Sequence, residues 1–544
     1  MKKTLDKERK VQTEDKLFNF RPLFFVGVAL CIGVVFSYVV TVYGISPLWA
    51  LLPVSLAGMP FLFCTSWQHA KSVFIAFSVL FAFFLVGVFT FRAQIDDYRT
   101  NAVETGESYV SGCVIEYAAT AYDAHVVIDE LTIDGKSTKG KLIAYMPDSY
   151  TENISIADEL FLFGCLQSDG AIFNEYGFKA SQIHENIRFI MNVESCQKIG
   201  RSQSVFLNVR SRMQNVLQKG MDETPAAVAL ALLTGDTSRI DYSLLENVRY
   251  GGIAHIFAVS GLHIGALFAF CMWLTGKTFL SKTSKILRFV LTAAVLLFYG
   301  GVCGYTSSVM RASVMCLVFY AARLIGVKMD MLECIGLSAT IVLLFSPVAL
   351  FTVGFQLSFA ACLGIAFFAK LLNMGMLRLL VGKTPTRRLL ENGDAAPPTV
   401  WESTRNSIVS FVAVTLSAQI ATSPISLYHF GYLSVWSVFL NCLFVPIVSG
   451  VFAILLALVF IGCILPITAS AVLLKVPSVV FSALLLVFEV VDFSSFAITG
   501  LQLGLGSFFG YYGVCIFLSD KWNVNKPLQY TLAGVCALVF ALTL

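Results

Sequence analysis

Runs of about 20 apolar residues recur along this chain of 544 residues, and no other feature constrains its fold as strongly. A helix of that length crosses the hydrocarbon core of a bilayer. Hydrophobic residues make up 57% of the chain and charged residues 13%, about half the charged share of a soluble protein. The mean hydropathy is +0.77. The sequence therefore predicts a mostly α-helical polytopic membrane protein.

The N-terminal region is expected to hold three transmembrane helices within residues 22–92, near 22–43, 45–63 and 72–92. The first run is too long for a signal-peptide core and no small-residue cleavage site follows it, so we expect a retained anchor. Residues 1–21 form a leader that the positive-inside rule places in the cytoplasm, which puts residue 93 outside. The basic residues of this leader are Lys2, Lys3, Lys7, Arg9, Lys10, Lys16 and Arg21.

Residues 93–200 differ from the rest of the chain because short segments alternate between apolar and polar residues. SYVSGCVIEY, HVVIDELTI, GKLIAYMP, ELFLFGCLQS and IRFIMNV are typical of half-buried strands separated by turn residues. Five such strands favour a small β-barrel or sandwich, with an OB-like barrel as the first choice. The segment holds 17 acidic and 7 basic residues, hence a net charge near −10, which fits an extracytoplasmic domain.

Residues 203–220, QSVFLNVRSRMQNVLQKG, place apolar residues three and four apart with Arg and Lys between them. This spacing predicts an amphipathic helix. We expect it to lie at the membrane surface. An ordinary connecting helix is the alternative.

Residues 225–544 are expected to form a transmembrane channel domain. Apolar spans lie near 251–276, 286–303, 308–326, 331–346 and 348–370, and four or five more fill 406–544. Basic residues gather in the turns after the first and third of these spans and in a polar loop at 371–405, so all three fall inside if residue 251 enters from outside. Pro446 leaves the segment 434–465 as one kinked span or two shorter pieces. The whole chain then has about 13 transmembrane helices.

The segment GGIAHIFAVSGLHIGALFAF at 251–270 contains three polar residues, His255, Ser260 and His263. Ser260 and His263 share one helical face and could form a nucleophile and a base, but no orienting acid lies nearby. The six histidines form no metal-binding pattern, and two stretches that end in Gly-Lys-Thr lack the first glycine of a phosphate loop. We therefore expect no enzyme activity, no metal and no cofactor, and interpret the three residues as lining or gating groups at a broken, glycine-flanked helix.

Further polar residues lie within or beside the apolar spans. Such residues are costly at membrane depth and usually face a bundle interior or a water-filled path. Interhelical hydrogen bonding is the alternative for the uncharged side chains, and snorkelling to the interface is the alternative for Arg311. The residues expected to line a path are Asp236, Arg239, His255, Ser260, Gly261, His263, Ser307, Ser308, Arg311, Gln356, Ser358, Gln419, Thr422 and Ser423.

Most cysteines lie in apolar runs, where they act as small hydrophobic residues. Cys113 and Cys165 fall in the first and fourth predicted strands, which are neighbours in an OB-like barrel. A disulfide is permitted outside the membrane, so we expect a bridge between them. Cys196 is an alternative partner for either.

Four blocks of the sequence resemble a known family. ALLTGDTSRIDYSLLENVRYGGIAHIFAVSGLHIGAL (231–267), GYTSSVMRASVM (304–315), SPVALFTVGFQLSFAACLGI (346–365) and SAQIATSPISLYHFGYLSVWSVFLNCLFVPI (417–447) are similar to the ComEC-type competence channels. The segment 172–187 is similar to the N-terminal domain of that family. The resemblance covers roughly residues 20–520, and its A-V-S-G-L-H block is specific.

The resemblance implies translocation of single-stranded DNA across the cytoplasmic membrane during natural transformation, driven by an external motor. Its expected partners are single-stranded DNA, membrane lipid, a membrane-tethered DNA receptor outside and a cytoplasmic ATPase or single-strand-binding protein inside. Many family members continue into a metallo-β-lactamase-like nuclease domain that has no counterpart motif here, so either a separate nuclease degrades the other strand or this chain is a truncation. A permease for a small or lipid-linked molecule and a scaffold for an envelope complex are the alternatives.

A polyanion needs a wet passage whose wall holds each phosphate weakly. Because the blocks offer few cations, we expect a polar, sparsely charged conduit with steering at its mouths. Arg378, Lys383, Arg387 and Arg388, with Lys370 and Arg405 nearby, could receive the strand at a cytoplasmic exit, or they hold the loop inside. The acidic outer domain repels phosphate, so it either uses Lys136, Lys139 and Lys141 as a local DNA contact or docks a protein.

Overall fold

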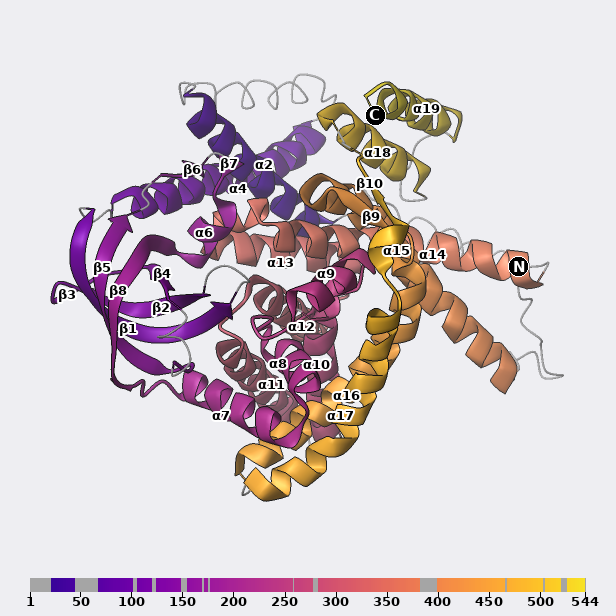
Figure 1. Ribbon diagram of the computed structural model, residues 1–544. Coiled ribbons are helices and arrows are strands. Elements are labelled where there is room, and N and C mark those ends of the chain that lie inside the picture. Colours follow the sequence, from indigo (N-terminus) through magenta and orange to yellow (C-terminus); the bar gives the residue numbers. More distant parts are fainter. Residues whose placement is uncertain are drawn as a thin grey trace.

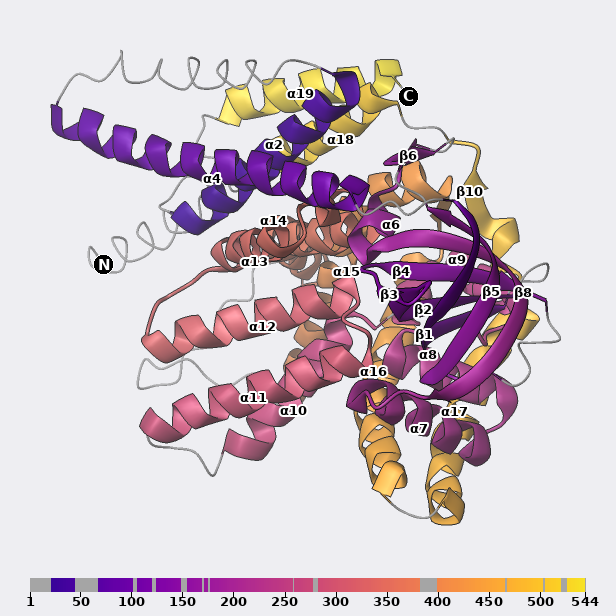
Figure 2. The same ribbon diagram turned by 90° about the vertical axis from the view of Figure 1, so that its left-hand side faces the viewer.

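The computed structural model describes residues 21–44, 67–100, 105–119, 124–147, 154–168, 171–174, 177–257, 259–276, 282–381, 399–464, 467–501, 504–519 and 526–543. A small β domain lies at one side of a larger set of helices (Figures 1 and 2). The described residues are mostly helical, as the sequence predicts. The predicted span at 45–63 and nearly all of the basic leader lie outside the described residues.

The two N-terminal helices, α2 (Pro22–Tyr43) and α4 (Trp67–Thr100), cross each other at two glycines. A Cβ atom on Gly33 would lie 2.1 Å from the carbonyl oxygen of Phe84, and one on Gly87 would lie 2.5 Å from that of Leu30. Only glycine therefore permits this close approach of the two backbones, which is the usual role of small residues between membrane helices.

The β domain contains the five predicted strands as β1 (Gly106–Ala119), β2 (Ala124–Ile133), β4 (Lys141–Met146), β5 (Asp158–Ser168) and β8 (Ile187–Arg201). β1 pairs antiparallel with both β2 and β5, β8 pairs antiparallel with β5, and β4 pairs antiparallel with β2 and parallel with β8. Each of these five strands therefore pairs with two of the others. The shorter elements of the domain are β3 (Lys136–Ser137), β6 (Phe173–Asn174), β7 (Gly177–Phe178) and α6 (Ala180–Glu185).

The core of this domain follows the alternation of its strands. Val110, Leu142, Leu160, Leu162 and Phe189 are completely buried. Along β5 the residues between them face outward and are partly or fully exposed, as a period of two requires. The apolar face of every long strand thus contributes to one core.

The predicted disulfide between Cys113 and Cys165 is wrong, and so is the alternative through Cys196, because all three are free thiols. β1 and β5 do pair, but their register opposes Cys113 to Glu159 and Cys165 to Glu107. The two thiols lie six residues apart along the ladder, about 20 Å. A bridge needs Cα atoms within about 7 Å.

The helices that follow the β domain form the rest of the molecule. α10, α11 and α12 lie side by side in both views, and α18 and α19 pair apart from them (Figures 1 and 2). β9 pairs antiparallel with β10. The elements are α7 (Val205–Gly220), α8 (Glu223–Thr234), α9 (Tyr242–Tyr250), η2 (Ala254–Ile256), α10 (Gly261–Gly276), α11 (Lys282–Val302), α12 (Ser307–Ile325), α13 (Met331–Phe345), η3 (Pro347–Phe351), α14 (Val353–Val381), α15 (Val400–Phe430), β9 (Tyr432–Ser434), α16 (Ser437–Ile464), α17 (Ile467–Val490), η4 (Phe493–Phe496), β10 (Ala497–Thr499), α18 (Leu505–Leu518) and α19 (Lys526–Thr543).

Nine helices within the described residues are long and apolar enough to cross a membrane, and four shorter apolar helices accompany them. The architecture is therefore that of a polytopic membrane protein, while the number of crossings stays a prediction. Pro446 lies inside the single helix α16, which selects the kinked-span alternative for 434–465.

The predicted loop at 371–405 is too long at both ends. α14 continues to Val381, and α15 begins directly after Thr399. Thr399 and Glu402 form a capping box there, in which each side chain accepts a hydrogen bond from the backbone N–H of the other, at 3.2 and 3.0 Å. This cap starts the helix earlier than the apolar pattern alone indicates.

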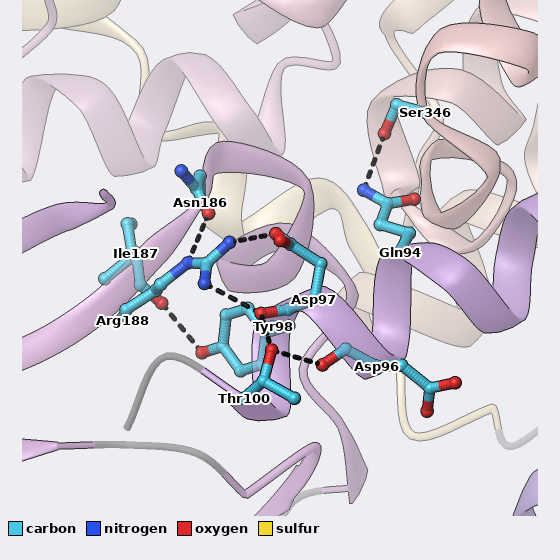
Figure 3. A network of polar contacts seen from close by, with 9 residues as sticks. All are labelled: Gln94, Asp96, Asp97, Tyr98, Thr100, Asn186, Ile187, Arg188 and Ser346. Carbon is cyan, nitrogen blue, oxygen red and sulfur yellow. Dashed lines mark hydrogen bonds and ion pairs between the residues drawn. The ribbon is translucent and has the colours of Figure 1, made fainter. Parts of the chain in front are cut away.

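Polar contacts join the β domain to the helices (Figure 3). The Arg188 guanidinium, on β8, donates at 2.5 Å to the carboxylate of Asp97 at the end of α4 and at 2.6 Å to Asn186. The Tyr98 hydroxyl donates to the carbonyl of Ile187 at 2.7 Å. Arg188 and Tyr98 are buried. The last turn of α4 and the first residues of β8 are therefore fixed to one another.

A second contact joins the N-terminal helices to the helices that follow the β domain. Arg21, at the start of α2, is buried and forms an ion pair with Asp330, which precedes α13. The start of α2 and the turn between α12 and α13 therefore lie together. The positive-inside argument also puts these two segments on one side of the membrane.

Candidate functional site

The helix break predicted around His255, Ser260 and His263 is present. α9 ends at Tyr250 and α10 begins at Gly261, with only a short 3-10 turn between them. Gly252 has φ +76°, and a Cβ there would lie 2.6 Å from the Cβ of Ser437. Glycine is needed at this position both for the left-handed backbone and for the approach of α16.

His263 is buried, with 1% of its surface exposed, and its ring stacks on Phe452 at 4.5 Å between centroids. Its Nδ1 accepts a hydrogen bond from the backbone N–H of Ser260 at 3.1 Å, while the Ser260 hydroxyl lies at 3.4 Å. Nδ1 therefore carries no proton, and its lone pair is directed at the amide. The bond from the Ser260 amide to His263 thus caps the start of α10. Because Nδ1 accepts from this amide rather than from the Ser260 hydroxyl, the geometry is poorly suited to activating Ser260 as a nucleophile.

The break is also tied to α15 and α16 by side-chain amides and a hydroxyl. Ser437 donates to the side-chain oxygen of Gln419 at 2.9 Å and lies 3.4 Å from the carbonyl of Gly252. Asn441 donates to Ser437 at 3.1 Å. Ser437 and Asn441 are buried, with 2% and 7% exposed. One uncharged network therefore connects the predicted residue Gln419 with the glycine-flanked segment.

Arg311 lies near the start of α12 and is the largest fully buried side chain among the described residues, with 1% exposed. Its guanidinium carbon lies 5.9 Å from the centre of the Phe355 ring and next to Gly354, the residue before it. Its burial argues against the snorkelling alternative. Further along α14, the side-chain oxygen of Gln356 accepts a hydrogen bond from His429 Nε2 at 2.9 Å.

Asp236 is paired with a residue that the sequence did not single out. Arg210 of α7 donates to the Asp236 carboxylate at 3.2 Å and to the carbonyl of Ile115 in β1 at 3.2 Å. The two charged side chains are only 9% and 2% exposed. Asp236 also accepts from the backbone N–H and hydroxyl of Ser238 at 3.1 and 2.5 Å. A buried ion pair thus joins α7, the loop after α8 and the β domain.

Arg239 belongs to the same junction. The side-chain amide of Gln214 is oriented so that its oxygen accepts hydrogen bonds from the Arg239 guanidinium, from Nε at 3.1 Å and from Nη2 at 2.6 Å. The Glu116 side chain reaches the surface beside this junction. Partial loss of solvent at the junction raises the pKa of its carboxyl, the Asp236 charge raises it further, and the Arg210 charge opposes the rise. The junction thus brings together two arginines, Arg210 and Arg239, and two carboxyl groups, Asp236 and Glu116.

Other predicted path residues make local contacts or lie apart. Thr422 and Ser423 donate to carbonyls of their own helix, at 2.9 Å to Ala418 and 2.5 Å to Gln419, rather than across to a neighbouring helix as the interhelical alternative would have it. Ser308 and Ser358 are half-buried, whereas His255 and Gly261 are exposed. Ser307 begins α12, but its side chain lies outside the description.

The predicted cytoplasmic exit is described only at its edges. Arg378 and Lys370 lie exposed on α14, and Arg405 contacts Asn406 on α15. Lys383, Arg387 and Arg388 fall in the interval 382–398, outside the described residues. Whether these cations form one surface stays a prediction.

The sequence missed several members of these clusters, namely Arg210, Gln214, Ser437, Asn441 and, as a path residue, His429. Arg210 and Gln214 lie four apart on the face of α7 that also holds Met213 and Leu217, and this face is buried. The i to i+4 spacing was therefore a signal that the two polar residues share the apolar face. Ser437 and Asn441 show the same spacing on α16.

A cavity of about 900 Å³ lies elsewhere, between the β domain, the start of α7 and α11. Its wall includes Glu130, Glu159, Arg201, Phe206 and Phe298, and none of the predicted path residues. The polar clusters described above are instead packed against neighbouring helices in this conformation.

The fold and these clusters define a class, a polytopic membrane protein whose helical part buries linked polar side chains beside a broken helix. The sequence model of the Competence protein family matches residues 232–541. The chain therefore belongs to the competence-protein family.

Two curated relatives match parts of the chain. ComE operon protein 3 of Bacillus subtilis is 27% identical over 314 residues, which is 57% of this chain and 34% of that protein. The uncharacterised protein MG316 of Mycoplasma genitalium is 29% identical over 224 residues, 40% of this chain and 48% of that protein. The chain thus spans a third to a half of the length of these relatives. No solved structure matches it significantly.

Proposed function

We propose that this protein takes single-stranded DNA across the cytoplasmic membrane during natural transformation, through a polar passage and driven by an external motor. Membership in the competence-protein family supports a role in DNA uptake. The observation that carries the passage is the hydrogen-bond network that links half-buried Gln419 and buried Ser437 and Asn441 to the helix break at Gly252. All of these residues lie within the part of the chain that the family matches.

The chemistry of these clusters suits weak contact with a moving polyanion. Amide and hydroxyl groups can hydrogen-bond phosphates and bases without holding them as a row of cations would. The cations are few, and Asp236 neutralises Arg210. Arg311 is the cation placed among the uncharged clusters, beside Gly354. We infer a passage that is closed at rest and opens when these hydrogen bonds exchange for bonds to the strand.

The β domain is proposed to be an OB-like barrel on the outer side of the membrane. The cycle β1-β5-β8-β4-β2, which β1–β2 pairing returns to its start, supports closure. The parallel pairing of β4 with β8, among otherwise antiparallel pairs, supports the OB topology. The contact of Arg21 with Asp330 supports a cytoplasmic location for the leader and for the turn after α12.

We propose that the chain itself is not an enzyme and needs no cofactor. The partner on the cytoplasmic side is then an ATPase or a single-strand-binding protein, and a separate nuclease degrades the other strand. A membrane-tethered receptor delivers DNA from outside. These partners are inferred from the proposed role in DNA uptake, and the contacts described above do not identify them.

The test is uptake of labelled DNA in a deletion strain complemented with Arg311→Gln or with a matched control. Arg311→Gln is expected to reduce internalised DNA at least tenfold while leaving surface-bound DNA unchanged, since a buried cation in the passage is lost. Arg323→Gln, which changes an exposed arginine near the other end of α12, should leave uptake intact. Normal internalisation by Arg311→Gln at wild-type protein abundance would remove Arg311 from the path.

A further inference from the structure

An exposed cluster of aromatic rings lies on the outer face of β1 and β5. Tyr109 lies opposite Phe163 in the strand register. Its ring centroid is 4.8 Å from that of Phe163 and 5.6 Å from that of Phe161, the second pair being stacked. Tyr109 is 52% exposed and Phe161 is 39% exposed. β1, β5 and β8 lie on the side of the domain away from α9 to α12 and face the reader in Figure 2.

These rings are not needed to fill the core. The intervening residues Leu160 and Leu162 point inward and are completely buried. An aromatic cluster on a solvent-facing sheet exposes apolar surface that a partner can cover, and aromatic residues are enriched where proteins bind one another.

Carboxylates lie beside the cluster. Glu107 lies two residues before Tyr109 and so shares the outer face of β1. The Asp134 carboxylate accepts a hydrogen bond from the backbone N–H of Tyr109 at 2.9 Å. The lysine on the neighbouring part of β8, Lys198, is held in an ion pair with the buried Asp158 at 2.6 Å. Lys136 lies in the same β2–β3 hairpin as Asp134, but the segment as a whole has a net charge near −10, so the setting is negative.

We propose that this surface, defined by Tyr109, Phe161 and Phe163, docks an arginine-rich segment of a protein partner. A guanidinium stacks on an aromatic face and pairs with carboxylates at its edge. A DNA strand meets the same aromatic faces but is repelled by the carboxylates within the screening length. The inference goes beyond the proposed passage and does not depend on it, because it concerns only what the outer face of the β domain binds.

The experiment uses the full chain in detergent and fluorescence anisotropy. The probes are a fluorescein-labelled peptide of alternating arginine and glycine, its lysine counterpart, a labelled 20-nucleotide single strand, and vesicles with anionic lipid. The test variant is Tyr109→Ala with Phe161→Ala, and a second variant, Glu107→Gln, changes charge without changing shape. Tyr145→Ala is the control, because Tyr145 is 36% exposed on β4, which does not pair with β1 or β5.

The arginine peptide is expected to bind more tightly than the lysine peptide, because only a planar guanidinium stacks on the rings. The double variant should weaken arginine-peptide binding by about tenfold, Glu107→Gln should weaken it less, and Tyr145→Ala should not change it. Equal binding by the double variant and the unmodified chain would overturn the proposal. So would binding of the single strand or the vesicles that the double variant abolishes, since the surface would then serve nucleic acid or lipid.

Discussion

Replacing Asp236 with alanine tests the buried ion pair that joins α7 to the loop after α8. The change leaves the Arg210 guanidinium, 9% exposed, beside the Ile115 carbonyl but without its carboxylate. Removing one member of a buried pair costs about 3–5 kcal/mol, because the remaining charge stays desolvated. Asp236→Asn keeps an oxygen acceptor and should cost less, about 2 kcal/mol. A loss of this size is a large part of the stability of a typical domain.

The chain offers a matched control for this change. Asp241 accepts from the backbone N–H and hydroxyl of Ser243 at 2.8 and 2.6 Å, much as Asp236 does from Ser238, but it is exposed and caps α9. Asp241→Ala should therefore cost only about 1 kcal/mol, the usual loss for an N-cap.

The measurement is thermal unfolding of the purified protein in detergent, with Arg210→Met and the double variant Arg210→Met with Asp236→Ala completing the cycle. Because both charges are gone, the double variant should recover most of the stability that Asp236→Ala loses, a coupling of about 2 kcal/mol or more. Additive effects of the single changes, or equal losses at Asp236 and Asp241, would refute the claim that burial of the pair sets its energy.

Three further predictions rest on separate features. Gly252→Ala should destabilise the protein by about 2 kcal/mol or more in the same unfolding assay, because the left-handed backbone and the contact with Ser437 both exclude a Cβ; Gly450→Ala, inside α16 with nothing within 4 Å, should be neutral or stabilising. His184 hydrogen-bonds Ser346 at 2.7 Å. Burial, and to a smaller extent the charges of Arg311 and Lys141, lowers the pKa of its imidazole below the ordinary 6.5. As pH falls, the histidine is therefore protonated in the unfolded chain before it is in the folded one, so stability should fall as pH drops below about 6.5. His184→Gln should flatten that part of the pH profile, and an unchanged profile would contradict this assignment. Arg188→Gln, which loses the bond to the Asp97 carboxylate, should make the junction of α4 and β8 more sensitive to added protease than Lys198→Gln does.

The strands could be predicted from the sequence because alternation reports which residues share a face. Register cannot be predicted in this way, and the cysteine bridge failed for that reason. Cys113 and Cys165 do lie on paired strands, but six residues out of alignment. The exact pairing depends on bulges, such as the one between Ser111 and Cys113 in the pairing of β1 with β2, that leave no pattern in the hydrophobicity.

The polar clusters could be predicted in part. The broken helix at 251–260 and the burial of Arg311 agree with what glycines and a lone arginine in an apolar run indicate. The partners could not be predicted, because Ser437 bonds Gln419 across two helices and Arg210 meets Asp236 from a helix interpreted as lying at the surface. Long-range pairs of this kind depend on how helices pack, which periodicity within one helix does not contain.

The central claim is that the polar clusters around the helix break line the path of the strand. A photo-crosslinking amino acid at Asn441, which is 7% exposed, should capture labelled DNA during uptake, whereas the same group at Ile454 of the same helix, 60% exposed on its outer face, should not. Capture at Ile454 but not at Asn441, in strains that take up DNA normally, would contradict the account.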